Sequence, residues 1–420
     1  MRVQGGPYDE VSGAPVPQLG PGVVSAPASG TLRLSGTGTV FRFTSAVRTR
    51  PRQGGPPRMN PYLRTPAALT ALALSATLAA CGTSEEGNAS DGNDVRIGLL
   101  LPENETARYE KFDKPLMEKK VALLTLGKGK VVYANAMGDA AKQNAQADAM
   151  IESKVDVLVV DAVDSKAIAG AVTKAKAAGI PVVAYDRLAE GPVDAYVSFD
   201  NEDIGRLQGK TLLDSLGDRA RNGKIVMMHG ALTDPNAAGY KAGARAVLDG
   251  KVSIGKEYDT AEWKRENASA NMTAAISALG KDKIVGVYSA NDGMAGGIIS
   301  ALKAAGVSPL PPVTGQDIEL AAVQRIVAGD QFMSVYKPYS REAESAAELA
   351  ILLAQGEKID GIINQVVSSP TTKRVPAILI LGVSVTRDNI RSTLVLDNVY
   401  TVEEICTQTL KAACDGIGLE

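Results

Sequence analysis

The feature that most constrains the fold is an alternation that begins at Val95, where short apolar runs are followed by helical patterns of roughly ten to fifteen residues. Strands that alternate with helices in this way predict βαβ units and a parallel sheet. A run such as Val155–Val160 is almost continuously apolar, which is typical of a strand covered by helices on both faces. We therefore expect an α/β protein with Rossmann-like, doubly wound parallel sheets.

The predicted elements follow one another from Val95 to Gln355. We expect strands at Val95–Leu101, Val131–Ala134, Val155–Val160, Pro181–Tyr185, Ala195–Phe199, Lys224–Met228, Ser253–Glu257, Ile284–Tyr288, Val313 and Phe332–Tyr336. We expect helices at Ala107–Lys120, Ala140–Ser153, Ser165–Ala178, Ile204–Leu216, Ala237–Leu248, Arg265–Leu279, Met294–Ala305, Leu320–Ala328 and Arg341–Gln355. About eleven strands are too many for one ordinary open sheet, so two α/β lobes are predicted.

Composition limits the chemistry that this chain can perform. Residues 1–80 hold eight Arg and two acidic residues, which leaves 37 basic and 45 acidic residues from Cys81 onward. A region this acidic is not expected to bind nucleic acid. With one histidine, His229, and three cysteines, the chain lacks ligands for a Cys/His zinc site, and a catalytic triad would have to use His229. Composition alone leaves carboxylate-based catalysis and a magnesium site open; we expect neither a metal nor a cofactor.

The first eighty residues differ from the rest. Residues 1–58 are rich in Gly, Pro, Ser and Arg and lack a sustained apolar period, so we expect disorder there. Our hypothesis is that they form an upstream extension that is not translated, with the true start at Met59. Residues 59–80 are predicted to be a signal peptide, because Arg64 precedes an uncharged run, Ala67–Ala80, that ends in small residues. This run is shorter than the ~20 residues of a bilayer-spanning helix.

Cys81 follows the run directly. The sequence Leu-Ala-Ala-Cys at 78–81 resembles the bacterial lipoprotein box, in which the cysteine becomes the lipid-modified N-terminus. A plain secretory signal with an incidental cysteine is the alternative. On the lipoprotein interpretation, residues 81–94 are a polar tether, and lipidated Cys81 anchors an extracytoplasmic body to the outer face of the cell membrane.

Polar side chains follow most of the predicted strands. Ligands of open α/β sheets bind beyond the carboxyl ends of the strands, so these side chains are candidates for a binding site. They are Glu103, Asn104, Arg108, Tyr109, Asp186, Arg187, Asp234, Asn236, Asn291, Asp292, Gln316, Asp317 and Lys337. Taken singly, Asp186, Asn291 or Asp317 could instead cap the following helix, and Arg187 could form a surface ion pair.

Together these groups suit a sugar. Carboxylates, guanidinium groups and carboxamides donate and accept the paired hydrogen bonds that neighbouring hydroxyls offer. Trp263 and Tyr109 fall in ligand-side loops, where ring faces could sandwich a pyranose, although Trp263 could also be a half-buried packing residue. Phosphate binding is disfavoured because the sequence G-x-x-x-x-G-K-S/T is not present. His229 ends an apolar strand and is expected to be structural.

Seven short segments occur in a specific order. They are Thr-Ala-Arg-Tyr at 106–109, Val-Ala-Tyr-Asp-Arg at 183–187, Ser-Phe-Asp-Asn at 198–201, Asp-Pro-Asn-Ala at 234–237, Ala-Asn-Asp at 290–292, Gly-Gln-Asp at 315–317 and Val-Tyr-Lys-Pro at 335–338. In these segments the chain, from about Val95 to Tyr400, resembles the sugar-binding proteins of bacterial ABC importers, which have the type I periplasmic-binding fold. It is most similar to their xylose-binding and multiple-sugar-binding branch.

The resemblance implies which residues contact the sugar. They are Arg108, Asp186, Arg187, Asn236, Asn291, Asp317 and Lys337, together with Asp234, and Trp263 matches the aromatic stacking position. Tyr109 stands where the xylose-binding branch usually has a second Trp. The loop before Asp234 begins Gly-Ala-Leu-Thr, where relatives commonly have Gly-Gly-Ser-Pro.

The resemblance also implies two lobes joined by a three-strand hinge. We place the crossings between lobes near Ser198–Asn201, Tyr336–Pro338 and Val367–Val375. The N-terminal lobe then holds residues 95–199 and 338–370, and the C-terminal lobe holds residues 200–337 and 371–420. A sugar that touches both lobes favours closure of the hinge, and the closed form is what the membrane permease of such a system recognises.

The remaining cysteines, Cys406 and Cys414, lie near the C-terminus. Outside the cytoplasm they could form a disulfide, and two reduced, buried thiols are the alternative. A helix over these eight residues would rise ~12 Å, which is beyond bonding reach, so a disulfide requires the chain to turn between them.

The leading hypothesis is a monomeric, non-enzymatic, lipid-anchored receptor that delivers a monosaccharide to an ABC permease. Xylose is the first expectation, followed by glucose, galactose, arabinose and ribose. A sensor that presents sugar to a chemotaxis or kinase partner is one alternative, and a glycosidase that uses Asp186 and Asp317 is another. A regulator of the sugar-repressor type is excluded, because residues 59–94 hold an apolar run and a lipobox where a basic helix-turn-helix would be needed.

Overall fold

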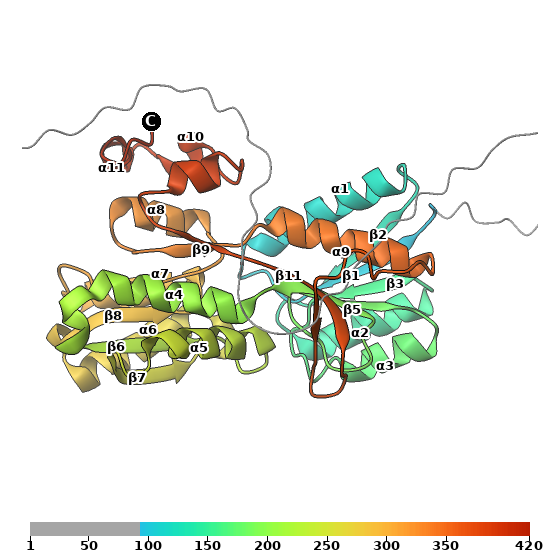
Figure 1. The fold of residues 1–420 in the computed structure, drawn as a ribbon, viewed down its shortest axis with the longest axis horizontal. Coiled ribbons are helices and arrows are strands. Elements are labelled where there is room, and N and C mark those ends of the chain that lie inside the picture. The colour runs from blue at the N-terminus through green and yellow to red at the C-terminus, as the bar shows by residue number, and fades with distance from the viewer. Residues whose placement is uncertain (1–92) are drawn as a thin grey trace, which may run out of the picture. The chain divides into compact units, whose positions relative to one another are not determined.

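A computed structural model describes residues 93–420, and strands and helices alternate along this part of the chain (Figure 1). The predictions of an upstream extension at 1–58, a signal peptide at 59–80 and lipidation at Cys81 lie outside the described residues, as does most of the tether at 81–94. Within residues 93–420, no helix has the length and apolar character needed to cross a membrane.

The elements match the predicted alternation. The strands are β1 (Arg96–Leu101), β2 (Lys130–Asn135), β3 (Val157–Val160), β4 (Val182–Tyr185), β5 (Ala195–Phe199), β6 (Lys224–His229), β7 (Ser253–Asp259), β8 (Ile284–Ser289), β9 (Ser334–Tyr336), β10 (Gln365–Val367), β11 (Val375–Ile380) and β12 (Val383–Val385). The helices are α1 (Lys114–Leu124), α2 (Ala140–Glu152), α3 (Ala169–Ala177), α4 (Asn201–Leu216), α5 (Pro235–Leu248), α6 (Arg265–Leu279), α7 (Asp292–Ala304), α8 (Leu320–Ala328), α9 (Tyr339–Ala354), α10 (Val402–Ile405) and α11 (Lys411–Asp415). The predicted strand at Val313 is reduced to a single bridge with Val287.

The N-terminal lobe is built on a seven-stranded sheet in the order β10-β11-β5-β4-β3-β1-β2. Neighbouring strands are parallel except β10, which is antiparallel to β11. Successive side chains of β1 pack on opposite faces: Leu99 joins the core under α1 and α9, whereas Leu100 joins the core with α2 and α3. Both faces are therefore covered, which explains why the strands are apolar throughout.

The C-terminal lobe contains a parallel sheet in the order β7-β6-β8. Single bridges from Val287 to Val313 and from Gln316 to Val335 extend it toward the antiparallel pair of β9 and β12. Helix α4 packs along α5, and α6 packs along α7. The core of this lobe includes Met227 on β6 and Ile298 on α7, both fully buried. Figure 1 shows the two lobes side by side, each with its own sheet.

The chain crosses between the lobes at three places. It passes from β5 to α4 across Asp200, from β9 to α9 across Lys337–Pro338, and from β11 to β12 across Leu381–Gly382. The Asp200 amide donates a hydrogen bond to the Ile380 carbonyl at 2.9 Å, which ties the first crossing to the third. The hinge is therefore a set of neighbouring segments.

The prediction of a third crossing at Val367–Val375 is wrong. There β10 turns into β11, and β11 pairs in parallel with β5 in the N-terminal sheet. The N-terminal lobe therefore extends through Ile380, and residues 371–380 belong to it. The apolar run that forms β11 covers an edge of β5 that would otherwise expose unpaired backbone groups.

The C-terminal segment forms a small cap on the C-terminal lobe. Helices α10 and α11 contact α8, and Leu394 and Ile405 are buried in the core that they share (Figure 1). Cys406 and Cys414 are joined by a disulfide, with their Cα atoms 6.0 Å apart. The chain turns between α10 and α11, as a bond between residues eight positions apart requires.

Helices α4 and α5 approach so closely that two positions require glycine. A Cβ atom at Gly205 would lie 2.1 Å from the Tyr240 carbonyl oxygen, and one at Gly243 would lie 1.9 Å from the Glu202 carbonyl oxygen. This packing also brings the two helix N-termini together, where the Asn201 amide donates to Asn236 Oδ1 at 2.8 Å.

The Gly243→Ala variant is expected to lower the free energy of unfolding by about 1–3 kcal/mol, because backbone atoms must move apart to admit the methyl group. Gly170→Ala is the matched control, since Gly170 is exposed on α3 and its Cβ would meet nothing within 4 Å. That control is expected to be neutral or more stable by about 0.5–1 kcal/mol. Urea denaturation followed by circular dichroism measures both, and equal effects would contradict the close packing.

Candidate ligand-binding site

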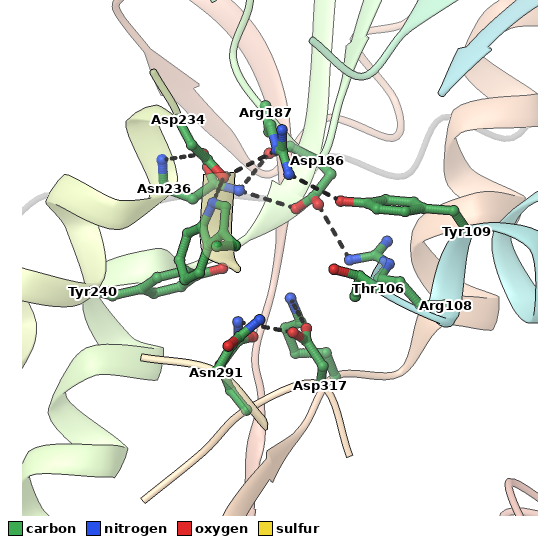
Figure 2. A pocket seen from close by; sticks show the side chains of 13 residues that line it. Thr106, Arg108, Tyr109, Asp186, Arg187, Asp234, Asn236, Tyr240, Asn291 and Asp317 are labelled. Carbon is green, nitrogen blue, oxygen red and sulfur yellow. Dashed lines mark hydrogen bonds and ion pairs between the residues drawn. The ribbon is translucent and has the colours of Figure 1, made fainter. Parts of the chain in front are cut away.

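Side chains from both lobes converge on one cavity at the carboxyl ends of the strands (Figure 2). Its empty space, the opening to solvent included, measures about 310 Å³. The lining contains the ten residues predicted to contact the ligand: Arg108, Tyr109, Asp186, Arg187, Asp234, Asn236, Trp263, Asn291, Asp317 and Lys337. Thr106, Tyr240 and Gln316 complete it.

The topology explains why these residues meet. In the N-terminal lobe β1 lies between β2 and β3, and in the C-terminal lobe β6 lies between β7 and β8. The strand order reverses at both places, so the loops that leave the central strands open into a crevice. The loop after β1 carries Arg108, and the loop after β6 carries Asp234. The cavity is therefore the meeting point of two switch points, one from each lobe.

The capping alternative holds for some of these residues. Asn291 Oδ1 accepts from the Met294 amide at 2.9 Å and caps α7, and Asp234 Oδ1 accepts from the Asn236 amide at 2.9 Å and caps α5. Each cap uses one atom of the side chain and leaves the other for the cavity. Asp186 and Asp317 cap no helix; both have positive φ angles, 54° and 96°, which are rare for residues other than glycine. Strained backbone of this kind is typical of binding sites.

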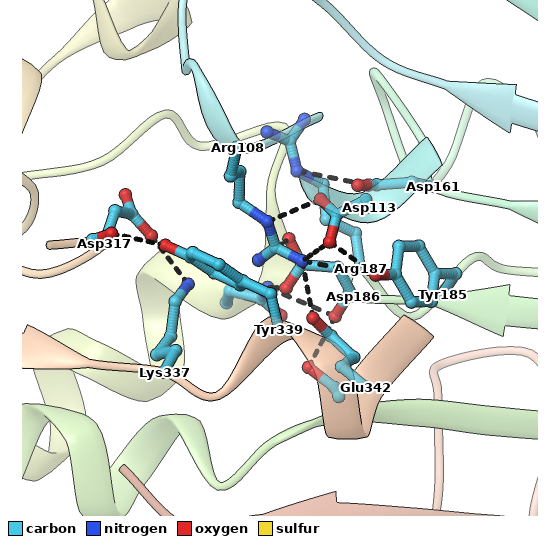
Figure 3. A network of polar contacts seen from close by, with 12 residues as sticks. Arg108, Asp113, Asp161, Tyr185, Asp186, Arg187, Asp317, Lys337, Tyr339 and Glu342 are labelled. Carbon is cyan, nitrogen blue, oxygen red and sulfur yellow. Dashed lines mark hydrogen bonds and ion pairs between the residues drawn. The ribbon is translucent and has the colours of Figure 1, made fainter. Parts of the chain in front are cut away.

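Arg108 lies in a buried cluster of carboxylates (Figure 3). Its Nε donates to Asp113 Oδ2 at 2.7 Å, its Nη1 to Asp186 Oδ2 at 3.3 Å, and its Nη2 to Glu342 Oε2. The guanidinium also lies 4.4 Å from the ring centroid of Tyr339. Arg108 is thus fixed on several sides, and Asp186 is the member of this cluster that also lines the cavity.

Arg187 is held between carboxylates of the two lobes. Its Nε lies 3.0 Å from Asp234 Oδ2 in the C-terminal lobe and 3.5 Å from Asp161 Oδ1 in the N-terminal lobe. Its Nη1 donates to the Ala162 carbonyl at 3.0 Å, and its Nη2 to the Tyr109 hydroxyl at 3.3 Å. The alternative that Arg187 forms a surface ion pair is wrong, because Arg187 follows the end of β4 into the cavity, where it is 7% exposed.

Direct contacts across the cavity show that the lobes are closed. Besides the pair of Arg187 and Asp234, the Asn236 amide donates to Asp186 Oδ1 at 3.0 Å and to the Asp186 carbonyl at 3.2 Å. At the rim, the Ser165 amide donates to the Thr233 carbonyl at 3.2 Å. Each of these bonds joins the N-terminal lobe to the C-terminal lobe, so each would break on opening.

A second buried ion pair forms the floor of the cavity at the hinge. Lys337 Nζ lies 2.8 Å from Asp317 Oδ1, and Asp317 Oδ2 accepts from Gln316 Nε2 at 3.2 Å. The hydroxyl of Tyr339 donates to the Asp317 carbonyl. Lys337 and Tyr339 flank the second crossing, so the hinge itself positions this part of the site (Figure 3).

Aromatic rings supply the apolar part of the lining. Trp263 donates from Nε1 to Asp234 Oδ2 at 3.2 Å, and its ring packs edge-on against Tyr240 with centroids 6.3 Å apart. Gly230 makes room for it, because a Cβ atom there would lie 2.0 Å from the indole ring. A polar ring of hydrogen-bonding groups with aromatic walls matches the hydroxyls and C–H faces of a sugar.

Burial and neighbouring positive charges shift the pKa values of the acids in the site in opposite directions. Burial raises the pKa of Asp186, but Arg108, Lys337 and Arg187 together outweigh it and lower that pKa below its ordinary value. For Asp234, burial dominates and raises the pKa, although Arg187 opposes the change. Asp186 is therefore held more firmly than Asp234 as a charged hydrogen-bond acceptor.

Some of the candidate binding-site residues do not line this cavity. Glu103 and Asn104 line a neighbouring cavity. Asp292 is the first residue of α7 and is buried, where it accepts from Gln331 and Ser334. His229 is outside the cavity lining and lies 2.6 Å from Glu257, consistent with a structural role. No group of three or more potential metal ligands is found within residues 93–420.

Three residues of the lining were not among the predicted sugar contacts, although Gln316 was one of the candidate polar residues. Thr106 begins one of the segments quoted above, and Gln316 directly precedes Asp317. Tyr240 follows Asn236 by four positions, which is one turn of a helix, so both point to the same side. A search for residues one turn after each candidate on a helix would have found Tyr240.

Comparison with known proteins gives further evidence about the family of this chain. The periplasmic binding protein domain family matches residues 97–358. The D-xylose-binding periplasmic protein of Haemophilus influenzae is 35% identical over 324 residues, which cover 76% of this chain and 94% of that protein. The multiple sugar-binding periplasmic receptor of Rhizobium radiobacter is 30% identical over 330 residues, which cover 74% of this chain and 92% of that protein.

A solved structure shares the fold. An ABC transporter solute binding protein from Clostridium phytofermentans with bound β-D-glucose superimposes with a TM-score of 0.67 at 27% identity, covering 74% of this chain and 99% of that one. A carbohydrate transporter solute binding protein from Chloroflexus aurantiacus in complex with D-glucose has a TM-score of 0.66 at 28% identity, with 73% and 97% coverage.

The Gly230→Ala variant is expected to displace the Trp263 ring, because the added methyl group occupies the position of the indole. Trp263 is the one tryptophan of the chain, so intrinsic fluorescence reports on it alone. We expect the emission maximum of Gly230→Ala to shift to longer wavelength, with unchanged circular dichroism. Gly361→Ala is the control, since its Cβ would meet nothing within 4 Å; identical spectra for the two variants would refute the contact.

Proposed function

This chain belongs to the periplasmic binding protein domain family, and we propose that it captures one monosaccharide, xylose or a related aldose, between its lobes and delivers it to an ABC-type membrane permease. The family consists of binding proteins, so the chain is a receptor and the glycosidase alternative is set aside. The relatives named for xylose and for multiple sugars favour an aldose as the ligand.

The observation that carries the proposal is the balance of charge around the cavity. Six charged side chains line it, and three of them are cationic and three acidic: Arg108, Arg187, Lys337, Asp186, Asp234 and Asp317. A charged ligand would disturb this balance in a buried place, which is costly. A neutral polyol instead accepts from the cations and donates to the acids at the same time.

Closure provides a way to retain the ligand. Asp186 and Arg187 belong to the N-terminal lobe, whereas Asn236 and Asn291 belong to the C-terminal lobe, and all four face one space. A ring bound between them contacts both lobes, so it binds the closed state better than the open state and shifts the equilibrium toward closure. The closed receptor is then the form that the permease recognises.

We also propose that the protein is a lipoprotein held at the outer face of the cell membrane. The support comes from the sequence, where a signal peptide pattern at 59–80 ends in Leu-Ala-Ala-Cys and a polar tether follows Cys81. An anchor of this kind keeps the receptor close to its permease and raises the local concentration of the loaded form.

Asp186→Ala is expected to weaken aldose binding about a hundredfold or more, because it removes a charged acceptor and the bond to Asn236. Asn291→Ala is expected to act in the same direction. The fold should persist in Asp186→Ala, because Arg108 keeps Asp113 and Glu342 as partners. Calorimetry and Trp263 fluorescence measure the affinity for a panel of common aldoses, and circular dichroism measures stability.

Asp139→Ala is the control for these variants, since Asp139 caps α2 away from the cavity and its loss tests the cost of a missing cap alone. For the wild type, a sugar at a hundredfold excess over its dissociation constant should raise the free energy of unfolding by about 2.7 kcal/mol. If ligand-free, folded protein bound none of the aldoses, the proposal would be overturned.

Cys81→Ser is expected to release the protein from the membrane fraction, because the side chain that carries the lipid is removed. Cell fractionation and metabolic labelling with a fatty acid analogue measure this, with Ser84→Ala as a control that should stay anchored and labelled. A wild-type protein that carries no label would contradict the lipoprotein assignment.

A further inference from the structure

A second cavity lies beside the first. We call the sugar cavity described above the inner cavity, and the neighbouring one, lined among others by Glu103, Asn104, Met137 and Lys264, the outer cavity. The empty space of the outer cavity, its opening included, measures about 590 Å³. Both lobes contribute to it, as they do to the inner cavity. Of the ten residues predicted to contact the sugar, Arg187 and Trp263 line the outer cavity, and both also line the inner one.

The two cavities are neighbours that share part of their walls. Arg187 and Trp263 line both of them and therefore form the partition. Three loops contribute to both linings. In the first loop, residues 103–105 line the outer cavity, and Thr106, Arg108 and Tyr109 line the inner one. In the second, Thr233 lines the outer cavity and Asp234 the inner one, and in the third, residues 262–264 line the outer cavity and Trp263 also lines the inner one. Asp234 Oδ2 lies 3.0 Å from Arg187 Nε and 3.2 Å from Trp263 Nε1, so this partition is closed in the structure, and the outer cavity lies directly behind it.

The Glu103 carboxylate holds the wall between them. Its Oε2 accepts from the Thr106 amide at 3.0 Å and from the Glu105 amide, so the loop keeps Glu105 on the outer side and Thr106 on the inner side. Burial raises the pKa of Glu103, although Arg187 lowers it. The same loop therefore shapes both spaces.

The chemistry of the outer lining differs from that of the inner one. Met137, Val163 and Ala231 add aliphatic surface to the edge of Trp263, and Asn104 and Thr233 add neutral polar groups. Two of the charged side chains are paired, Lys264 with Glu262 at 2.6 Å and Arg187 with Asp234, and Glu103 and Glu105 add two further carboxylates. Aliphatic and aromatic surface with neutral polar groups and carboxylate acceptors fits the faces and hydroxyls of another sugar ring.

We infer that the outer cavity is a second saccharide subsite, so that the receptor accepts a disaccharide with one ring in the inner cavity and the next ring in the outer cavity. The glycosidic oxygen lies between Arg187 and Trp263, and its entry requires these two side chains to move apart from Asp234 Oδ2, which both contact. The second ring contacts both lobes, Asn104 and Met137 on one side and Thr233 and Lys264 on the other. This inference rests on the proposed function, because it presumes that a sugar ring fills the inner cavity.

The test uses the full chain, freed of bound ligand, and calorimetry with xylose, glucose, xylobiose, cellobiose and maltose. We expect at least one disaccharide to bind within about tenfold of the affinity of its monosaccharide. Met137→Trp places a bulky ring in the outer cavity from an exposed position. It is expected to weaken that disaccharide about tenfold or more and to leave the monosaccharide within about twofold.

Leu126→Trp is the matched control. Leu126 is also an exposed apolar residue with a positive φ angle, 54° against 56° for Met137, and it lies outside both linings. It should change neither affinity. Monosaccharide binding without any disaccharide binding would overturn the outer subsite and leave the proposed function standing. Disaccharide binding that Met137→Trp does not weaken would overturn it as well, and failure of every sugar would overturn the proposed function itself.

Discussion

The burial of opposite charges determines how the two lobes of this protein fit together. Arg108 and Arg187 are only 3% and 7% exposed, a burial that an unpaired cation would not tolerate. Their partners arrive from separate parts of the chain: Glu342 comes from α9 after the second crossing, and Asp234 comes from the first turn of α5. Arg108 therefore needs the strand-end loops and the helix after the second crossing in register, and Arg187 gains its partner Asp234 only when the lobes close. The same requirement fixes Asp186 before any ligand arrives, which lowers the cost of ordering the site on binding.

The placement of these partners also sets the balance between open and closed states. When the lobes separate, Arg187 leaves Asp234 but keeps Asp161, which is fully buried in its own lobe. Asn236 leaves Asp186 in the same way, and Arg108 keeps Asp113 and Glu342. Neither arginine loses all of its acidic partners on opening, and the exposed groups gain water as a partner, so the net cost of opening is modest. A modest difference is what allows the contacts of one small ligand to shift the population.

The sequence revealed the parts of this architecture that depend on local patterns. Strand runs such as the one around Leu158, and caps such as Asn291, are visible without a structure because periodicity and helix starts are local. The hinge was placed ten residues too early because β10 is short and exposed, and Pro376 interrupts β11, so nothing in the pattern separates them from a crossing. The partners of Arg108 could not be foreseen, because Glu342 lies 234 positions away and only the fold brings the two together.

Trp263 shows most clearly what sequence patterns cannot predict. Its residue type indicated a stacking role, but its position depends on backbone that no pattern announces: Glu262 and Trp263 both have φ near 57°, a conformation that costs about 1–3 kcal/mol at each residue. That strain is offset by the hydrogen bond to Asp234, by packing against Tyr240 and by the space that Gly230 leaves. The result is one ring held in the partition between two cavities, with its polar edge bonded to an inner residue. A ring in that position can contact a sugar on either side. The strained backbone of Glu262 and Trp263 therefore determines how many rings of a saccharide the site can contact.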